Sequence, residues 1–250
     1  MAKITVYKFL LFLLRIGYTK RKYKRALLGG ILLINVFREP VSGFTHMAGA
    51  ILSLIGMIFL LVPSIQLESP IHIAAFLIFG LSLILLYTAS TLYHLLPLSD
   101  KGVLRLKKID HMMIFVLIAG TYTPVCLLAL EGWWRTGMLL GIWTFALGGI
   151  FLKAFWINAP RWFSTGIYLL MGWLVVVAIV PIYQALSIEG FSFLFLGGLF
   201  YSVGAVIYGL KRPNITTKHF GFHEIFHIFV MLGSLFHFLM MYIYILPMEA

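Results

Sequence analysis

The sequence contains very little charge and almost no cysteine. Only 11% of its 250 residues are Asp, Glu, Lys or Arg, and 62% are hydrophobic. A soluble domain has about a quarter charged and about half apolar residues. A soluble core of this length cannot bury so much apolar surface, so we expect lipid to be the solvent. The single cysteine, Cys126, excludes an internal disulfide framework and a cysteine-based zinc site.

Acidic residues are also scarce. The chain has 8 acidic and 19 basic residues, and its formal net charge is +11. In a soluble protein this excess would indicate a nucleic-acid partner. Here the basic residues lie in short segments between apolar runs, so we expect them to mark membrane topology and to contact anionic lipid head groups. We predict membrane lipids and no nucleic acid as partners, and the sequence does not indicate the oligomeric state.

Seven apolar runs are long enough to cross a bilayer, which takes about 17–25 helical residues. They cover residues 44–65, 71–96, 109–130, 137–157, 163–186, 191–210 and 221–246. The connections between them are short, and no soluble domain is inserted. The fold class that we predict is an all-α integral membrane protein, with one seven-helix transmembrane domain over residues 39–250.

The basic residues are distributed asymmetrically over the two sides of these spans. All of the 19 Lys and Arg residues except Arg135 fall in the N-terminal arm or in and around the second, fourth and sixth connections. Cytoplasmic loops carry the excess of Lys and Arg in membrane proteins. We therefore predict a cytoplasmic N-terminus and an extracytoplasmic C-terminus.

The N-terminal arm, residues 1–38, is basic and contains no run long enough to span. Residues 4–16 are apolar apart from Lys8 and Arg15, and a basic cluster follows at 20–25 instead of a small-residue cleavage site. This pattern argues against a cleaved signal peptide. We interpret the arm either as an interfacial segment on the cytoplasmic leaflet or as a disordered tail.

Four ionisable side chains fall at one predicted depth near the cytoplasmic face. His94 ends the second span, Asp110 begins the third, and His223 and His227 begin the seventh. Ionisable residues are costly within membrane spans and often mark functional sites there. Because His223 and His227 are four residues apart, they lie on one helical face and can bind one metal ion together.

His94 would complete a three-histidine metal site. Three imidazole nitrogens leave the fourth position of a tetrahedral zinc ion open for water, which is the catalytic arrangement, although iron or copper would also accept them. Asp110 could take the proton of that water, and the Ser90 hydroxyl would lie one turn deeper than His94. Two alternatives stay open: the histidines could be interfacial residues without a metal, and Asp110 could cap the third helix.

Three further residues carry weaker signals. His237 lies ten residues beyond His227, roughly 15 Å along the helix, so we expect it to hydrogen-bond a neighbouring helix instead of sharing the metal. His46, at the start of the first span, could support the metal ligands indirectly. Glu39 precedes the first span and could anchor a basic residue nearby.

The combined motifs resemble those of the hemolysin III proteins, the bacterial branch of the progestin and adiponectin receptor family. They are Glu39-Pro-Val-Ser-Gly-Phe-Thr-His46, Ser90-Thr-Leu-Tyr-His94, Asp110-His111, Ala119-Gly-Thr-Tyr-Thr-Pro124, His223-Glu-Ile-Phe-His227 and His237-Phe238. The resemblance covers residue 38 to the C-terminus. It implies a multi-pass protein of the bacterial plasma membrane with a cytoplasmic N-terminus and a zinc ion near the cytoplasmic face.

The resemblance also implies roles for individual residues. In the adiponectin receptors three histidines bind the zinc ion, and they match His94, His223 and His227. The receptors' aspartate, which contacts the zinc-bound water, matches Asp110, and their serine matches Ser90. Because these receptors are similar to alkaline ceramidases, the leading hypothesis is a zinc-dependent hydrolase of a lipid amide, with Asp110 and Ser90 as its catalytic residues.

Three other functions stay open. The zinc ion could be a structural clamp in a non-enzymatic sensor of membrane homeostasis, or the chain could be a cytolysin, as the family name implies. His223-Glu-Ile-Phe-His227 also matches the zinc-protease pattern H-E-x-x-H. However, Glu224 lies about 100° around the helix from His223, and the adiponectin receptors have Gln there. A lipid-accessible cavity beside the metal would favour the hydrolase, and a closed metal site would favour the clamp.

Overall fold

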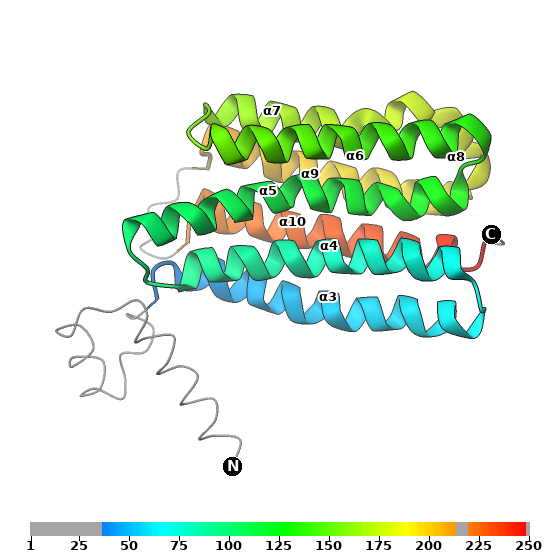
Figure 1. Ribbon diagram of the computed structural model, residues 1–250, viewed down its shortest axis with the longest axis horizontal. Coiled ribbons are helices and arrows are strands. Elements are labelled where there is room, and N and C mark those ends of the chain that lie inside the picture. The colour runs from blue at the N-terminus through cyan, green and yellow to red at the C-terminus, as the bar shows by residue number, and fades with distance from the viewer. Residues whose placement is uncertain (1–36, 214–219, 249–250) are drawn as a thin grey trace, which may run out of the picture.

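The structure is a computed structural model, and it describes residues 37–213 and 220–248. Within these residues, seven helical spans with a mean hydropathy of 1.7–2.3 are long and apolar enough to cross a membrane, which confirms the predicted fold class. They lie side by side as one bundle (Figure 1). The elements are α3 (Pro40–Gln66), α4 (Pro70–Leu95), α5 (Asp100–Pro124), η2 (Val125–Ala129), α6 (Gly132–Phe155), α7 (Arg161–Gly172), η3 (Trp173–Ala178), α8 (Ile179–Ala185), α9 (Ile188–Leu210), α10 (Phe222–Met240) and η4 (Met241–Ile245).

Helices α5 and α10 lie in the middle of the bundle in the view of Figure 1. Helix α4 packs between α3 and α5, α10 packs against both α9 and α3, and α7 packs against α9. Figure 1 shows α3 and α4 on one side of the bundle and α6, α7 and α9 on the other. Span α5–η2 is the most buried of the seven, whereas α3 exposes large apolar side chains such as Leu52 and Phe59. Exposed apolar side chains on a membrane span are expected to face lipid.

The third span begins earlier than hydropathy predicts. Helix α5 starts at Asp100 instead of residue 109, because its first turns are helical but too charged to register as an apolar run. Asp110 therefore lies in the third turn of α5. The alternative that Asp110 caps this helix is wrong, because its side chain is far from the free N–H groups of the first turn.

The fifth span is not one continuous helix. It passes from α7 through the 3-10 segment η3 to α8, which contains Pro181. Proline removes a backbone donor and breaks a helix, and backbone groups freed at membrane depth need other partners. Tyr122 of α5 supplies them: its hydroxyl donates to the carbonyl oxygen of Gly172 over 2.7 Å and accepts from the N–H of Val175 over 2.6 Å.

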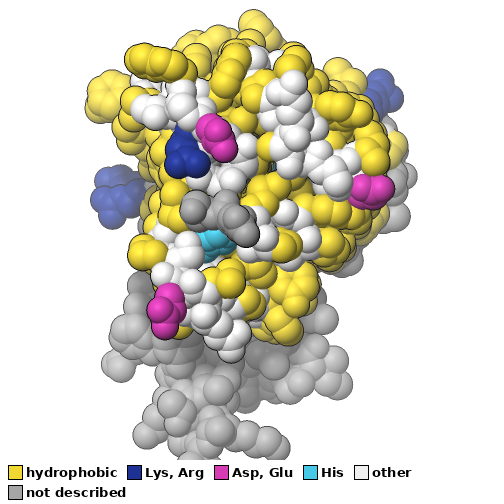
Figure 2. Space-filling view, turned by 90° about the vertical axis from the view of Figure 1, so that its right-hand side faces the viewer, with side chains coloured by type: hydrophobic (Ala, Val, Ile, Leu, Met, Phe, Trp, Pro, Cys, Tyr) yellow, Lys and Arg dark blue, Asp and Glu magenta, His cyan; other side chains and the backbone are white. Residues whose placement is uncertain are grey.

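The two ends of the bundle differ in charge. We call the end at which α3 begins and α4 finishes the His94 end; the described chain finishes at the opposite end (Figure 1). Among the described Lys and Arg residues, only Arg135 belongs to the opposite end. Figure 2 shows that opposite end, whose surface is mostly hydrophobic with few basic side chains. The assignment of the His94 end to the cytoplasm stays a prediction. So does the interpretation of the arm 1–38, of which residues 1–36 lie outside the described part of the chain.

Candidate metal centre

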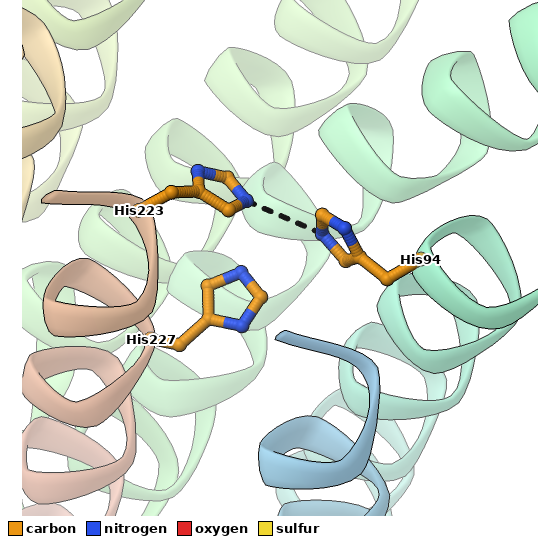
Figure 3. Close-up of side chains that lie close together, drawn as sticks. All are labelled: His94, His223 and His227. Carbon is orange, nitrogen blue, oxygen red and sulfur yellow. Dashed lines mark hydrogen bonds between the residues drawn. The ribbon is translucent and has the colours of Figure 1, made fainter. Parts of the chain in front are cut away.

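Three histidines meet at the His94 end of the bundle. His94 lies in the last turn of α4, and His223 and His227 lie in the first two turns of α10. One ring nitrogen from each lies within 4.8 Å of the other two, and the rings face one another across the space between α4 and α10 (Figure 3). His94 and His227 are buried, and His223 is half-buried. The structure therefore brings together the three residues that spacing and topology predicted as ligands.

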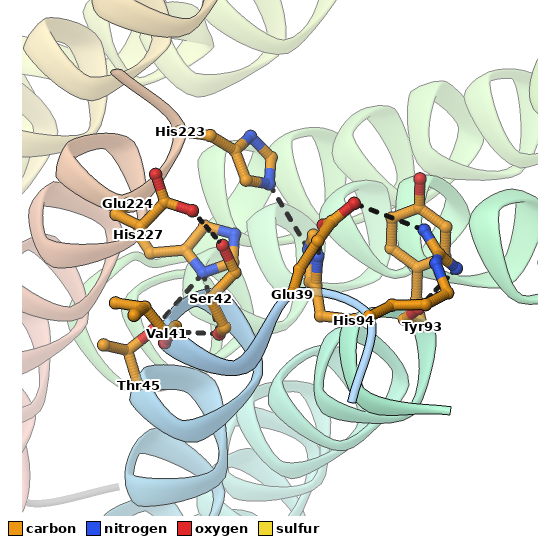
Figure 4. Close-up of polar contacts among 10 residues, drawn as sticks. Glu39, Val41, Ser42, Thr45, Tyr93, His94, His223, Glu224 and His227 are labelled. Atoms are coloured by element: carbon orange, nitrogen blue, oxygen red, sulfur yellow. Dashed lines mark hydrogen bonds and ion pairs between the residues drawn. The ribbon is translucent and has the colours of Figure 1, made fainter. Parts of the chain in front are cut away.

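Hydrogen bonds orient two of these rings. The Nδ1 of His94 donates to the Glu39 carboxylate, and the Nδ1 of His227 donates to the Ser42 carbonyl oxygen over 3.2 Å (Figure 4). Such a bond keeps the proton on Nδ1 and leaves the Nε2 lone pair for a metal ion. Both rings are therefore held in the tautomer that a metal ligand needs.

The spacing of the ring nitrogens suits one metal ion. The Nε2 atoms of His94 and His223 lie 3.3 Å apart. Two nitrogens bound to zinc at about 2.0–2.1 Å and at a tetrahedral angle lie about 3.3 Å from each other. The three imidazoles could therefore hold one zinc ion, and an all-nitrogen donor set also suits iron or copper.

Glu39 makes one contact that the sequence predicted and one that it did not. Its carboxylate pairs with Arg38 over 3.3 Å, which confirms that it anchors a basic neighbour, but it also binds His94. Its backbone N–H donates to the carbonyl oxygen of His94 over 3.0 Å, so it contacts both the ring and the backbone. The hydrogen bond with His94 lowers the pKa of the Glu39 carboxyl group, although burial opposes the shift. The signal in the sequence was an acid before α3 at the predicted depth of His94.

His46 supports the site from α3. Its ring stacks on that of His227, with centroids 3.6 Å apart and planes inclined by 8°. It is buried, and neither of its ring nitrogens has a hydrogen-bond partner among the described residues. The expected support of a metal ligand by His46 is therefore present as a packing contact.

Glu224 turns away from the three rings, towards α3 (Figure 4). Its Oε1 accepts a hydrogen bond from the Ser42 hydroxyl over 2.5 Å, and its Oε2 accepts one from the Gly221 N–H over 2.8 Å. Both oxygens therefore hold the start of α10 in place and fix it to α3. This geometry does not suit the general base of a zinc protease, which must reach the metal-bound water.

Asp110 and Ser90 lie beside the histidines and face a shared cavity. Both line it together with His223, His227 and His46. The Ser90 side chain is close enough to hydrogen-bond to the Asp110 carboxyl group, and His94 acts electrostatically on that carboxyl group. Three helices, α4, α5 and α10, thus present Ser90, Asp110, His223 and His227 to one space.

The cavity extends from the histidines into the middle of the bundle. Its volume is about 480 Å³, within the range of about 300–1,000 Å³ found for small-molecule sites. Most of its wall surface is apolar, with apolar residues contributed by α5, α7, α9 and α10, and His237 also lines it, ten residues along α10 from His227. The Nε2 of His237 bonds to the Leu194 carbonyl oxygen over 3.1 Å, which confirms the expected bond to a neighbouring helix. The site is therefore open to a ligand-sized space.

Part of the cavity wall is also part of the bundle surface. Trp173 of η3 and Ser202 of α9 both line the cavity. The indole N–H of Trp173 donates to the Ser202 hydroxyl over 2.9 Å, and Trp173 is 37% exposed. The contact between Trp173 and Ser202 therefore belongs both to the cavity wall and to the predicted lipid-facing surface.

This chain is similar to known proteins over most of its length. The family model described as Haemolysin-III related matches residues 34–238. The "Hemolysin-3 homolog" of Bacillus subtilis (strain 168) is 41% identical over 203 residues, covering 81% of this chain and 92% of its own. The "Hemolysin-3" of Bacillus cereus is 39% identical over 213 residues, covering 85% and 94%. With its seven apolar spans, this chain is a multi-pass bacterial membrane protein that belongs to the haemolysin-III-related family.

Proposed function

We propose that this chain is a zinc-dependent hydrolase that cleaves an amide bond in a membrane lipid. The observation that carries the proposal is the cavity of about 480 Å³ that has Asp110, Ser90, His223 and His227 together in its wall. A ligand in this cavity would place a carbonyl group beside the metal site. The apolar remainder of the wall suits an acyl chain.

The donor set favours a catalytic metal over a structural one. Structural zinc sites usually have four protein ligands, and catalytic sites have three and an open position. Within residues 37–213 and 220–248, three histidines meet at the site, and the space beside two of them is the cavity. The open position would therefore face the ligand.

The residues of the site have separate roles in the proposed hydrolysis. When bound, zinc would act as a Lewis acid that makes a water molecule easier to deprotonate. Asp110 takes a proton from the water molecule as the water oxygen bonds to the carbonyl carbon of the lipid. Asp110 then returns the proton to the leaving nitrogen as the carbon–nitrogen bond breaks. Ser90 lies in the same cavity wall as Asp110 and would help to orient its carboxyl group. Glu39 and the Ser42 carbonyl oxygen hold the His94 and His227 rings.

One observation favours a second candidate, a structural clamp in a membrane sensor. A metal ion held by His94 and His227 would link α4 to α10, and Glu39 and His46 attach α3 to the same two residues. Loss of the metal would then loosen three helices at once. The relatives' names suggest a cytolytic activity, but no contact or cavity among the described residues supports it, so we do not propose it.

The variant Asp110→Asn separates the two candidates. Purified, zinc-loaded protein is incubated with amide-linked and ester-linked lipids bearing neutral and anionic head groups, and released fatty acid is measured by mass spectrometry. We expect wild-type protein to release fatty acid from an amide-linked lipid. The variant should retain zinc and release none, because an amide cannot accept the proton. Release by the variant at the wild-type rate, or none by the wild type from any lipid, would overturn the hydrolase.

A further inference from the structure

A lysine is buried in the wall of the cavity. Lys153 lies near the end of α6 and is only 1% exposed. It lines the cavity, and its Nζ donates to the Ser164 hydroxyl over 2.5 Å. In the part of the chain that the structure describes, no carboxylate lies within ion-pairing distance of it, since the ion pairs found there all involve Glu39. An ammonium group buried without an anion is costly.

Two more basic residues line the same cavity. Lys107 comes from α5 and Arg161 from the start of α7. The Arg161 guanidinium group lies over the Tyr208 ring at 4.6 Å, and its Nη1 donates to the Tyr208 carbonyl oxygen over 3.4 Å. A guanidinium group has five N–H donors, so several stay free for a ligand.

The three basic side chains share one cavity with the candidate metal site. Lys153, Lys107 and Arg161 line its wall together with His111 and the candidate metal ligand His223. The Nδ1 of His111 is buried and has no hydrogen-bond partner among the described residues, and His111 also lines the cavity. The cationic group is therefore close to the metal centre, within one continuous cavity.

We propose that the cavity binds an anionic lipid. Lys153, Lys107 and Arg161 hold its negatively charged group at the His94 end, and its acyl chain extends along the apolar wall towards His237. The bound anion offsets the desolvation and the mutual repulsion of the three cations. This proposal narrows the substrate class of the proposed hydrolase, but lipid binding itself requires neither the metal nor turnover.

Binding of two lipids that differ only in head-group charge tests the proposal. Purified protein in detergent is titrated with phosphatidylglycerol or with phosphatidylcholine of identical acyl chains, and the bound lipid is quantified by native mass spectrometry. Wild-type protein should retain phosphatidylglycerol preferentially. Lys153→Met should weaken that binding about tenfold or more, because a hydrogen bond to a charged group contributes about 1.5–3 kcal/mol. Phosphatidylcholine binding should change little.

Lys108→Met is the matched control. Lys108 carries the same charge next to Lys107, but its Nζ donates to the Ala154 carbonyl oxygen over 2.6 Å and it is not part of the cavity wall. This variant should bind phosphatidylglycerol as the wild type does. Equal losses in Lys153→Met and Lys108→Met would indicate general attraction at the membrane surface and would overturn the cavity site. Equal retention of both lipids by the wild type would also overturn it.

Further experiments cover a variant that fails to fold, binding of a free anion, and binding without turnover. If Lys153→Met does not fold, Lys107→Met and Arg161→Gln replace half-buried residues and should each weaken phosphatidylglycerol binding, and unchanged binding in both rejects the proposal. If inorganic phosphate stabilises the wild type as much as phosphatidylglycerol does, the site binds a free anion and the lipid assignment is wrong. Asp110→Asn should bind phosphatidylglycerol selectively although it does not hydrolyse lipid, which separates binding from turnover. Selective binding by a wild type that hydrolyses no lipid contradicts the proposed function alone, and hydrolysis by a wild type that binds without selectivity contradicts this inference alone.

Discussion

The two ends of the bundle use their polar residues differently. At the opposite end, polar side chains make local contacts: Ser69 with His72 over 2.8 Å, Arg135 with the Leu130 carbonyl oxygen over 2.8 Å. These partners are 3 and 5 residues apart in the sequence. At the His94 end, the bonds between Glu39 and His94 and between Ser42 and Glu224 join residues 55 and 182 positions apart.

This difference indicates that the fold holds the His94 end in a defined geometry. Local bonds finish helices and shape turns wherever a chain reverses direction. Bonds between distant segments fix α3, α4 and α10 relative to one another, and the candidate metal ligands lie on two of these helices. The His94 end therefore holds the candidate site through bonds between distant segments, whereas the bonds at the opposite end only shape turns. Each of the following experiments tests this difference between the two ends.

The largest expected effect is an all-or-none difference in location. A reporter fused after Ala250 should behave as extracytoplasmic, and one inserted near Lys101 should behave as cytoplasmic, because basic connections stay inside. Alkaline phosphatase and green fluorescent protein fusions report the two sides. If both positions report the same side, the charge difference between the two ends does not set the topology.

Removal of one candidate metal ligand should have the next largest effect. His223→Ala should lose most of the bound zinc, because it deletes one of three protein ligands. His72→Ala, at the opposite end, is the control and should keep its zinc. Zinc per protein chain is measured by mass spectrometry of the purified variants after dialysis against metal-free buffer. A full complement of zinc in His223→Ala would end the assignment of the site.

Glu39→Gln should have an intermediate effect. The amide keeps the size of the side chain but loses the charge that the His94 ring contacts, and loss of a residue that orients a metal ligand typically lowers metal affinity about 10–100-fold. The control Glu68→Gln alters an acid at the opposite end and should change nothing. Competition with a chelator of known affinity measures the difference. Equal zinc affinities for the two variants would show that Glu39 does not support the metal.

The smallest effect is expected for Glu224→Gln. Its carboxylate bonds to Ser42 and Gly221 and not to the metal site, so zinc and hydrolysis should be retained. Loss of the charge-assisted bonds should lower stability by about 1–2 kcal/mol, since hydrogen bonds to charged groups contribute about 1.5–3 kcal/mol. Thermal unfolding and the fatty-acid assay measure the two outcomes. An inactive variant with full zinc would favour the protease instead.

The spans were predictable, but their limits were only partly so. Length and hydropathy identify all seven, because each has to cover the thickness of the bilayer with apolar side chains. Hydropathy does not register the charged first turns of α5 or the break at η3, because it measures side-chain solvation and not backbone hydrogen bonding. Lys153 illustrates the same limit: it counts as a basic connection residue in the sequence, yet it lies buried on α6 against Ser164.

The sequence by itself determined the membrane environment, the number of spans and the shared face of His223 and His227, because hydropathy and helical periodicity are local properties of a chain. Only the tertiary structure decided that the Glu39 carboxylate binds His94, that His46 stacks on His227, and that a cavity joins Asp110 to Lys153. Those relations depend on how α3, α4, α5, α6 and α10 pack, and packing is set by side-chain shapes that meet across many residues of sequence.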